Sequence, residues 1–159
     1  MAKKGKTNAM RQLDANKIQY KIHEYDFADG LIDGISAARK ISRSSNEVYK
    51  TLVTQSQSKN YYVFLVPVDR ELHLKKAAAA AGEKKVEMIP VKDLQTITGY
   101  IKGGCSPIGM KKKFPTYIAK EAKELSTLIV SAGQIGKQIE LETADLLSVT
   151  NASAADLME

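Results

Sequence analysis

One glycine-rich stretch, residues 99–113, carries the residues best suited to chemistry. It holds four glycines and one proline within its first eleven residues, and it ends in three consecutive lysines. Glycine lets the backbone approach a ligand closely, and proline fixes the turn between the glycines. Backbone N–H groups on such a loop, with lysines beside them, suit an anionic or carbonyl-bearing ligand. A plain glycine-rich hairpin with a solvated lysine run is an equally good interpretation of this stretch alone.

Two side chains stand out as candidates for a chemical role. Lys50 shares a strand face with Leu52, so its methylene stem can be covered while its ammonium group reaches a pocket. A lysine that simply extends to the surface is the more common case. Cys105 lies inside the glycine loop, where neighbouring lysines would lower its pKa and favour a nucleophilic thiolate. Because no histidine is placed to act as its base, a nucleophilic cysteine is disfavoured.

Other motif matches are weak. Residues 104–111 imitate a phosphate-binding P-loop, but Met110 stands where that motif requires lysine. Residues 133–136 have the G-x-x-G spacing of a nucleic-acid clamp, yet strand patterns flank them, which favours a turn. His23 and His73 have no cysteine or carboxylate at metal-ligand spacing. We therefore expect no metal site.

Length, charge and cysteine content restrict the class of protein. A chain of 159 residues can bury its own core, and we expect one domain over residues 1–159. The net charge of +6 favours a polyanionic partner. A single cysteine fits a reducing compartment, and the chain shows neither an apolar leader nor an apolar run of membrane-spanning length. These features predict a cytoplasmic protein.

The elements that must position these residues form a mixed pattern. We expect helices over 8–16, 35–41, 74–81, 90–97, 119–125 and 143–149. We expect strands over 18–25, 49–53, 61–68, 84–88 and 114–118, and a hairpin of 128–133 with 137–141. Because strands outnumber clean β–α–β units, an α+β fold with a mixed sheet is favoured over a doubly wound one.

Several separate motifs, in one order, resemble a known family. They are Thr7–Met10, Val48–Val53, Pro67–Val68, Glu71–Lys76, Gly82–Met88, Thr98–Gly109 and Val130–Gly133. Over about residues 7–157 the chain resembles the YbaK/EbsC family of free-standing Cys-tRNA(Pro) deacylases, relatives of the editing domain of bacterial prolyl-tRNA synthetases. The resemblance implies an α+β domain with a barrel-like mixed sheet flanked by helices. It also implies an enzyme that removes cysteine from wrongly charged proline tRNA, and from Cys-tRNA(Cys) as a further substrate.

The resemblance also assigns roles to individual residues. It implies that Lys50 and Gly103 act in catalysis, and that the substrate is bound by Tyr25, Gly104, Ser106, Pro107, Ser131 and Gly133. Two positions depart from the family pattern. Gln138 stands where some members have an acidic residue, and the Leu31-Ile32 pair stands near an aromatic pocket position.

The implied mechanism explains why no catalytic triad is found. The thiol of the substrate's own cysteine attacks its ester carbonyl, so neither cofactor nor metal is expected. The implied partners are the acceptor end of mischarged tRNA and prolyl-tRNA synthetase, which would supply selectivity among tRNAs. A deacylase for another residue, such as alanine, and a binding module without turnover remain the alternatives.

Overall fold

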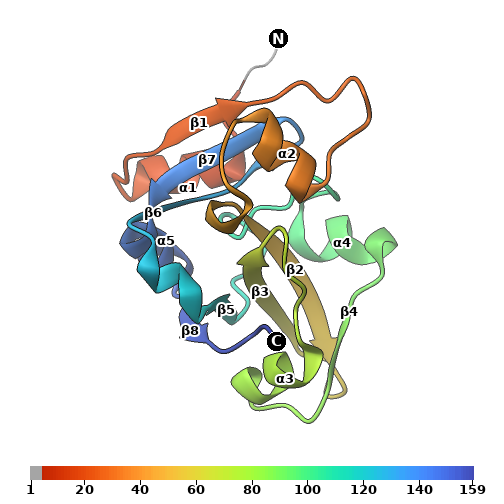
Figure 1. Ribbon diagram of the computed structural model, residues 1–159. Helices are drawn as coiled ribbons and strands as arrows, with labels where there is room; N and C mark the ends of the chain where they lie inside the picture. Colours follow the sequence, from red (N-terminus) through yellow and green to blue (C-terminus); the bar gives the residue numbers. More distant parts are fainter. Residues whose placement is uncertain (1–4) are drawn as a thin grey trace.

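A computed structural model describes residues 5–159 as an α+β fold with two β-sheets (Figure 1). The first sheet has the strand order β1-β7-β6, with both pairs antiparallel. Its strands are β1 (Lys21–Glu24), β6 (Thr127–Gln134) and β7 (Lys137–Glu142). The hairpin predicted around 134–136 is the β6–β7 turn.

The second sheet has five strands and contains the centre of the core. Its order is β4-β2-β3-β5-β8, and both antiparallel and parallel pairs occur, as predicted for a mixed sheet. The strands are β2 (Tyr49–Ser56), β3 (Tyr61–Pro67), β4 (Val86–Met88), β5 (Thr116–Ala119) and β8 (Ser153–Ala155). The continuous apolar run of β3 is buried over 62–67, and its side chains on both faces of this central strand belong to the core.

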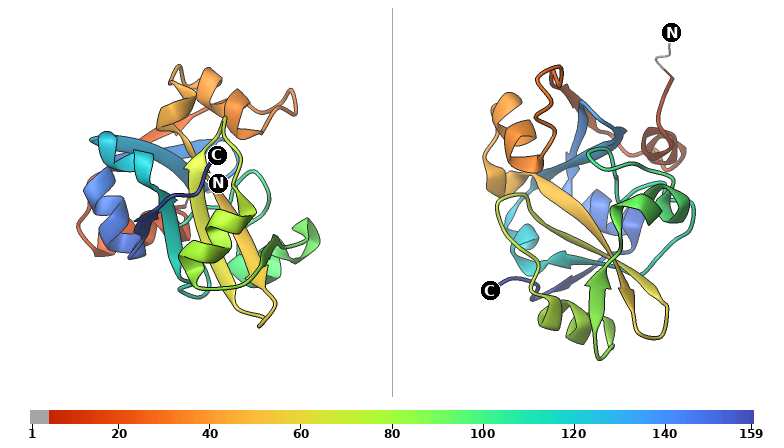
Figure 2. Two further views of the ribbon diagram at one scale, coloured as in Figure 1. Left: turned by 60° about the horizontal axis from the view of Figure 1, so that its bottom comes forward. Right: turned by 90° about the vertical axis from the view of Figure 1, so that its right-hand side faces the viewer.

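In the described part of the chain, five α-helices and two short 3₁₀ helices surround the sheets. They are α1 (Asn8–Ala15), α2 (Gly34–Lys40), α3 (Leu74–Ala81), α4 (Val91–Thr98), α5 (Thr143–Thr150), η1 (Ser45–Glu47) and η2 (Lys120–Glu124). Local capping explains several limits. The Thr7 side chain accepts a hydrogen bond from the Met10 N–H at 3.2 Å, and Gly82 ends α3 in the left-handed conformation. Figures 1 and 2 place α2 and α3 at opposite ends of β2.

Within residues 5–159, one isolated backbone bridge joins the two sheets. Val48 pairs in parallel with Ile129, and both side chains are fully buried. The bridge brings the start of β2 alongside β6, so side chains that follow Val48 and Ile129 on the same face of each strand become neighbours. This junction determines where the functional cleft forms.

Three elements differ from the sequence-based expectation. The strand expected over 18–25 begins only at Lys21, because the Ile18 N–H still bonds to the Leu13 carbonyl and closes the end of α1. The helix expected over 119–125 is the shorter 3₁₀ turn η2. Strand β8 was not predicted, because its alanines carry no strand signal. Within residues 5–159, no helix has the length and apolar character needed to cross a membrane.

Candidate functional site

A cleft of about 630 Å³ lies where the two sheets meet. It is lined by residues 30 and 32–35 ahead of and within α2, by 48–51 of β2, and by Val68 after β3. The glycine loop contributes Lys102, Gly103 and Cys105, and the first sheet contributes Ser131 and Gln138. The volume falls within the ordinary range of small-molecule sites. Lys50 and the glycine loop therefore open into the same cleft.

Lys50, Ser131 and Gln138 form a row across three strands. Lys50 and Ser131 each lie two residues beyond the Val48–Ile129 bridge, on strands running in the same direction. Ser131 pairs in register with Gln138 on β7. Because alternate residues share a face and paired side chains lie close, the row forms one continuous cleft wall. The sheet junction thus places a cation, a hydroxyl and an amide side by side.

The Lys50 ammonium group remains available to a ligand. Its side chain is 25% exposed, and one carboxylate of the described residues lies within ion-pair distance, Glu71 Oε2 at 3.7 Å. Glu71 is 95% exposed, and such surface pairs contribute about 0–1 kcal/mol. A phosphate or a developing oxyanion in the cleft can therefore displace Glu71 at small cost.

Gly103 lines the cleft, whereas Gly104, expected to bind substrate, is buried and does not line it. Gly103 has φ of 85°, and a Cβ there would stand 2.8 Å from Ile32 Cδ1. A Cβ on Gly104 would press on the backbone of the β6–β7 turn at 3.0–3.2 Å. The Gly104 N–H donates to the Ile101 carbonyl at 2.9 Å, whereas the Gly103 N–H has no protein acceptor within residues 5–159. Gly103 is therefore the glycine whose N–H is free to meet a ligand.

The remaining residues expected to bind substrate lie in two settings. Ser131 lines the cleft, whereas Ser106 and Pro107 are buried parts of the glycine loop that do not line it. The Ser106 Oγ accepts the Ile108 N–H at 3.2 Å. Gly133 has φ of 94° and leaves room for the Tyr100 ring. Ser106, Pro107 and Gly133 hold the loop in place rather than line the cleft.

Tyr25 is covered by α2. It is 8% exposed, and its hydroxyl group is buried without a hydrogen-bond partner among the described residues. The Lys40 Nζ lies 5.7 Å from the centre of its ring. Tyr25 does not line the cleft. It lies two residues after His23, which pairs with Gln138, and it therefore shares the sheet face of these two residues, the face that α2 covers.

Cys105 does not have the character of a nucleophile. It lines the cleft, as its position in the loop suggested. However, burial raises the pKa of its thiol to about 11, although a hydrogen bond with Thr98 acts in the opposite direction. The thiol is therefore protonated at neutral pH, and the effect expected from neighbouring lysines does not prevail.

The wall of the cleft contains two side-chain oxygens without hydrogen-bond partners, which the sequence alone did not reveal. Gln138 Oε1 and Thr51 Oγ1 are buried without hydrogen-bond partners in the described part of the chain. Asp33, the carboxylate in the cleft, instead caps α2: it accepts the Ser36 N–H at 3.0 Å and the Ser36 hydroxyl at 2.7 Å. These bonds hold the pKa of Asp33 below its usual value. Asp33 is therefore engaged in capping α2, and it forms no salt bridge with the lysines that line the cleft.

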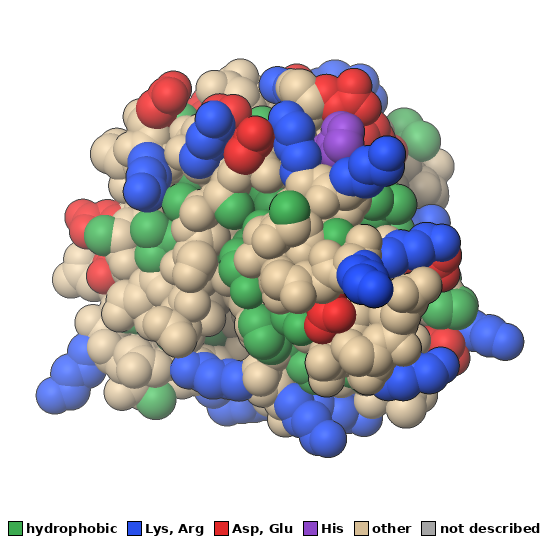
Figure 3. All heavy atoms as spheres, turned by 90° about the horizontal axis from the view of Figure 1, so that it is seen from below, with side chains coloured by type: hydrophobic (Ala, Val, Ile, Leu, Met, Phe, Trp, Pro, Cys, Tyr) green, Lys and Arg blue, Asp and Glu red, His purple; other side chains and the backbone are tan. Residues whose placement is uncertain are grey.

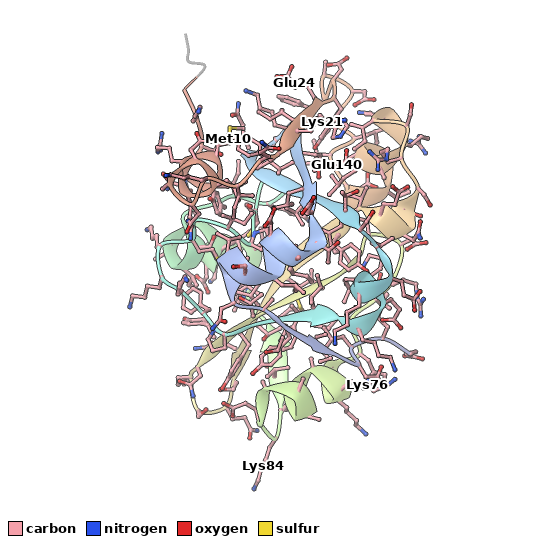
Figure 4. All side chains as sticks on the ribbon, turned by 90° about the vertical axis from the view of Figure 1, so that its left-hand side faces the viewer. Met10, Lys21, Glu24, Lys76, Lys84 and Glu140 are labelled. Atoms are coloured by element: carbon pink, nitrogen blue, oxygen red, sulfur yellow. The ribbon has the colours of Figure 1, made fainter. Side chains whose placement is uncertain are left out.

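A charge cluster clamps α2 and η1 onto the first sheet. Arg43 binds Glu140 through two hydrogen bonds, at 2.8 and 3.0 Å, and Glu47 at 2.6 Å. His23 Nε2 and the Thr127 hydroxyl also contact Glu140, at 2.8 and 3.1 Å. Figure 4 labels Glu140 below the tip of β1. Since Glu140 follows Gln138 on the same face of β7, the clamp fixes the wall that carries the row.

The clamp gives a testable pH dependence. The hydrogen bonds from Arg43, and then those from His23 and Thr127, lower the pKa of Glu140 to about 2. A lowered carboxyl pKa stabilises the fold at neutral pH, and this contribution is lost as pH falls from 4.5 toward 2. We expect Glu140→Gln to lower the free energy of unfolding at pH 7 by roughly 2 kcal/mol. In urea denaturation, the difference from wild type should shrink below pH 4.5.

Glu24→Gln is the matched control for this measurement. Glu24 lies on the adjacent strand, 69% exposed, with Lys137 Nζ at 3.9 Å. We expect its replacement to change stability by less than about 0.5 kcal/mol at either pH. A Glu140→Gln protein as stable as wild type at pH 7 would contradict the proposed clamp.

No group of three or more metal-ligating side chains is found within residues 5–159. The groups gathered in the cleft are instead two lysines, Lys50 and Lys102, a free backbone N–H and a serine hydroxyl, with two unpaired oxygens buried in the wall. Such a set can bind an ester or phosphate and orient it, and stabilise charge on a carbonyl oxygen. It contains no evident protein nucleophile.

Comparison with known proteins shows two similarities in sequence. A model of the family described as "Aminoacyl-tRNA editing domain" matches residues 33–149. The chain is 48% identical to EbsC of Enterococcus faecalis, named as a proposed Cys-tRNA(Pro)/Cys-tRNA(Cys) deacylase, over 99% of this chain and 98% of that protein. The similarity therefore extends beyond the separate motifs to nearly the whole chain.

Two solved structures share the fold. One is a proposed trans-editing enzyme for prolyl-tRNA synthetase, with a TM-score of 0.85, 22% identity, and coverage of 96% of this chain and 95% of that one. The other is the protein APE2540, of unassigned function, with a TM-score of 0.87, 19% identity, and coverage of 96% and 100%. At these identities the likeness concerns the fold alone.

Proposed function

The chain belongs to the aminoacyl-tRNA editing domain family, and on this premise we propose that it removes cysteine from mischarged tRNA(Pro) and from Cys-tRNA(Cys). The observation that carries the proposal is that Lys50, Gly103 and Ser131 line one cleft. The name of the Enterococcus faecalis relative supports the choice of substrate. The proposal treats residues 1–159 as one editing domain that acts without cofactor.

The proposed reaction uses the substrate's own thiol. Its sulfur attacks the carbonyl carbon of the cysteinyl ester, so that a C–S bond forms and the ester C–O bond breaks. The thiol proton ends on the released 3′ oxygen of the tRNA, and the amino acid leaves as a cyclic thioester that water then hydrolyses. An intramolecular nucleophile of this kind can have an effective molarity of ~10⁵ M or more when well oriented. This accounts for a cleft without a reactive cysteine or triad.

The cleft residues then have orienting and electrostatic roles. The Lys50 ammonium binds the negative charge near the reacting ester, on the terminal phosphate or on the developing oxyanion. Gly103 lines the same cleft, and its free N–H is proposed to donate to the carbonyl oxygen. Ser131 and Gln138, next to Lys50 in the row, contact the aminoacyl group.

The test is deacylation of one proline tRNA charged with cysteine, alanine or proline. We expect the purified protein to release cysteine at least tenfold faster than alanine or proline. Rapid alanine release with slow cysteine release would replace the proposal by an alanine deacylase, and no release above buffer would leave only a binding module.

The cleft is small, so we further propose that prolyl-tRNA synthetase supplies selectivity among tRNAs. The ratio of kcat/KM for Cys-tRNA(Pro) to kcat/KM for Cys-tRNA(Cys) should then rise when the synthetase is added. An unchanged ratio would contradict this role of the synthetase.

A further inference from the structure

The longest segment of the chain without an acidic residue leads directly out of the cleft. Residues 94–120 contain five lysines and no aspartate or glutamate. All five lysines are exposed, and none forms a salt bridge with a residue of the described range 5–159. A run of uncompensated positive charge on one loop is a binding surface for a polyanion.

Four of these lysines lie on the glycine loop, and we call them the loop lysines: Lys102, Lys111, Lys112 and Lys113. Lys102 lines the cleft next to Gly103. The Lys111 N–H donates to the Thr98 carbonyl at 3.0 Å, and its Nζ donates to the Thr96 carbonyl at 3.2 Å. These bonds hold Lys111 against the end of α4, close to where the chain turns toward Lys102. Lys112 and Lys113 follow, beside a shallow hollow that Pro107 and Met110 also line.

The loop that carries these charges is fixed to the rest of the fold. The Tyr100 hydroxyl donates to the Ile108 carbonyl at 2.6 Å and so ties the two arms of the loop together. Gly109 packs against the start of α1, where a Cβ would stand 2.9 Å from the Ala9 N atom. Figure 2 shows the segment between α4 and β5 running beside α4. The charges are therefore held in position before any ligand binds, which lowers the cost of binding.

At the other end of the molecule, acidic residues lie among the lysines, although Lys75 and Lys84 there form no salt bridge within residues 5–159. Lys76 lies 3.3 Å from Asp156, and Lys85 lies 3.2 Å from Glu87. Figure 3 shows basic and acidic side chains mixed around the face that includes this end, and Figure 4 shows Lys84 far from the tip of β1. Both ends carry lysines. They differ because acidic residues lie among the lysines at this end, whereas residues 94–120 contain none.

We propose that the loop lysines bind the sugar–phosphate backbone of the acceptor stem of the charged tRNA. This rests on the proposed function, since the aminoacylated end must enter the cleft while the polynucleotide continues outside it. The stem leaves the cleft past Lys102 and lies along Lys111, Lys112 and Lys113. Lysine contacts to phosphates position a nucleic acid without reading its sequence. The surface thus places the ester in the cleft and leaves selection among tRNAs to another component.

The test measures binding of a fluorescent, uncharged acceptor-stem RNA hairpin with a CCA end, as a function of KCl concentration. The variant is Lys111→Gln/Lys112→Gln/Lys113→Gln, and the matched control is Lys75→Gln/Lys84→Gln/Lys85→Gln, which removes the same charge at the opposite end. We expect the loop variant to bind about tenfold more weakly near 0.1 M salt. Its log–log salt slope should fall by about 2–3, because each phosphate contact contributes about 0.7–0.9. The control variant should retain the wild-type affinity and slope.

Equal losses in the two variants would overturn the proposal, because net charge would then explain binding; no loss in the loop variant would overturn it as well. Catalysis is not needed for this readout, so the binding result stands even if the protein fails to deacylate Cys-tRNA(Pro). In a parallel assay, the loop variant should hydrolyse the 3′-cysteinyl ester of adenosine at the wild-type rate, since this small substrate has no stem. A wild-type protein inactive on both substrates would contradict the proposed function and leave the binding comparison intact.

Discussion

Replacing Lys50 with methionine is expected to lower kcat/KM for Cys-tRNA(Pro) by about a hundredfold or more, the usual effect of removing one group that stabilises developing charge. Methionine retains an apolar stem of similar length, so the packing of β2 beside β6 should survive. The loss should lie in kcat as well as in KM, because the ammonium group is proposed to act on the reacting ester. Single-turnover deacylation kinetics measures both.

Glu71→Gln is the control that separates this role from simple loss of an ion pair. Glu71 is the carboxylate 3.7 Å from Lys50 and is almost fully exposed. Its replacement should change kcat/KM by less than about fivefold, because an exposed pair contributes at most about 1 kcal/mol. A Lys50→Met protein that folds and retains activity within a few-fold of wild type would contradict the assignment of Lys50.

Methylating the thiol of the substrate is expected to stop deacylation altogether. S-methylcysteinyl-tRNA(Pro) should lose its amino acid at the rate seen in buffer, because the methyl group removes the proton and most of the nucleophilicity of the sulfur. An oriented intramolecular thiol supplies an advantage of ~10⁵ M or more in effective molarity, and no side chain in the cleft replaces it. The measurement is release of labelled amino acid at saturating protein.

Binding must be checked before this result is interpreted. The methylated substrate should still compete with Cys-tRNA(Pro) for the protein, since the cleft of about 630 Å³ has room for one more methyl group. Enzyme-dependent release of S-methylcysteine at the rate of cysteine release would show that water or a protein group attacks the ester. The substrate-thiol mechanism would then be abandoned.

Much of the fold was predictable because its elements carry local signals. The apolar run of β3, the glycine at the end of α3 and the turn between β6 and β7 all follow from residue types at short range. The short strands were less accessible. Strand β8 contains small residues that pair with β5 only after the rest of the sheet exists, and η2 lacks a helical capping residue. These elements depend on tertiary contacts, which a single sequence does not display.

The site was partly predictable for a similar reason. Motif resemblance indicated Lys50, Gly103 and Ser131, and the structure brings these three into one cleft. The row with Gln138 was not predicted, because it depends on the Val48–Ile129 bridge between two sheets. The clamp of Arg43 on Glu140 joins residues 97 positions apart, and no spacing rule connects them. Cross-strand neighbours and long-range ion pairs therefore required the structure.

The most direct measurement follows the first product released from Cys-tRNA(Pro) by the wild-type protein, sampled on the time scale of one turnover. Mass spectrometry after rapid quenching should detect the cyclic thioester of cysteine. The thioester should appear at the rate at which the tRNA is deacylated and should then decay to free cysteine. Free cysteine formed from the outset, with no thioester at any time, would contradict the account, because the ester would then have been opened by a nucleophile other than the substrate's own sulfur.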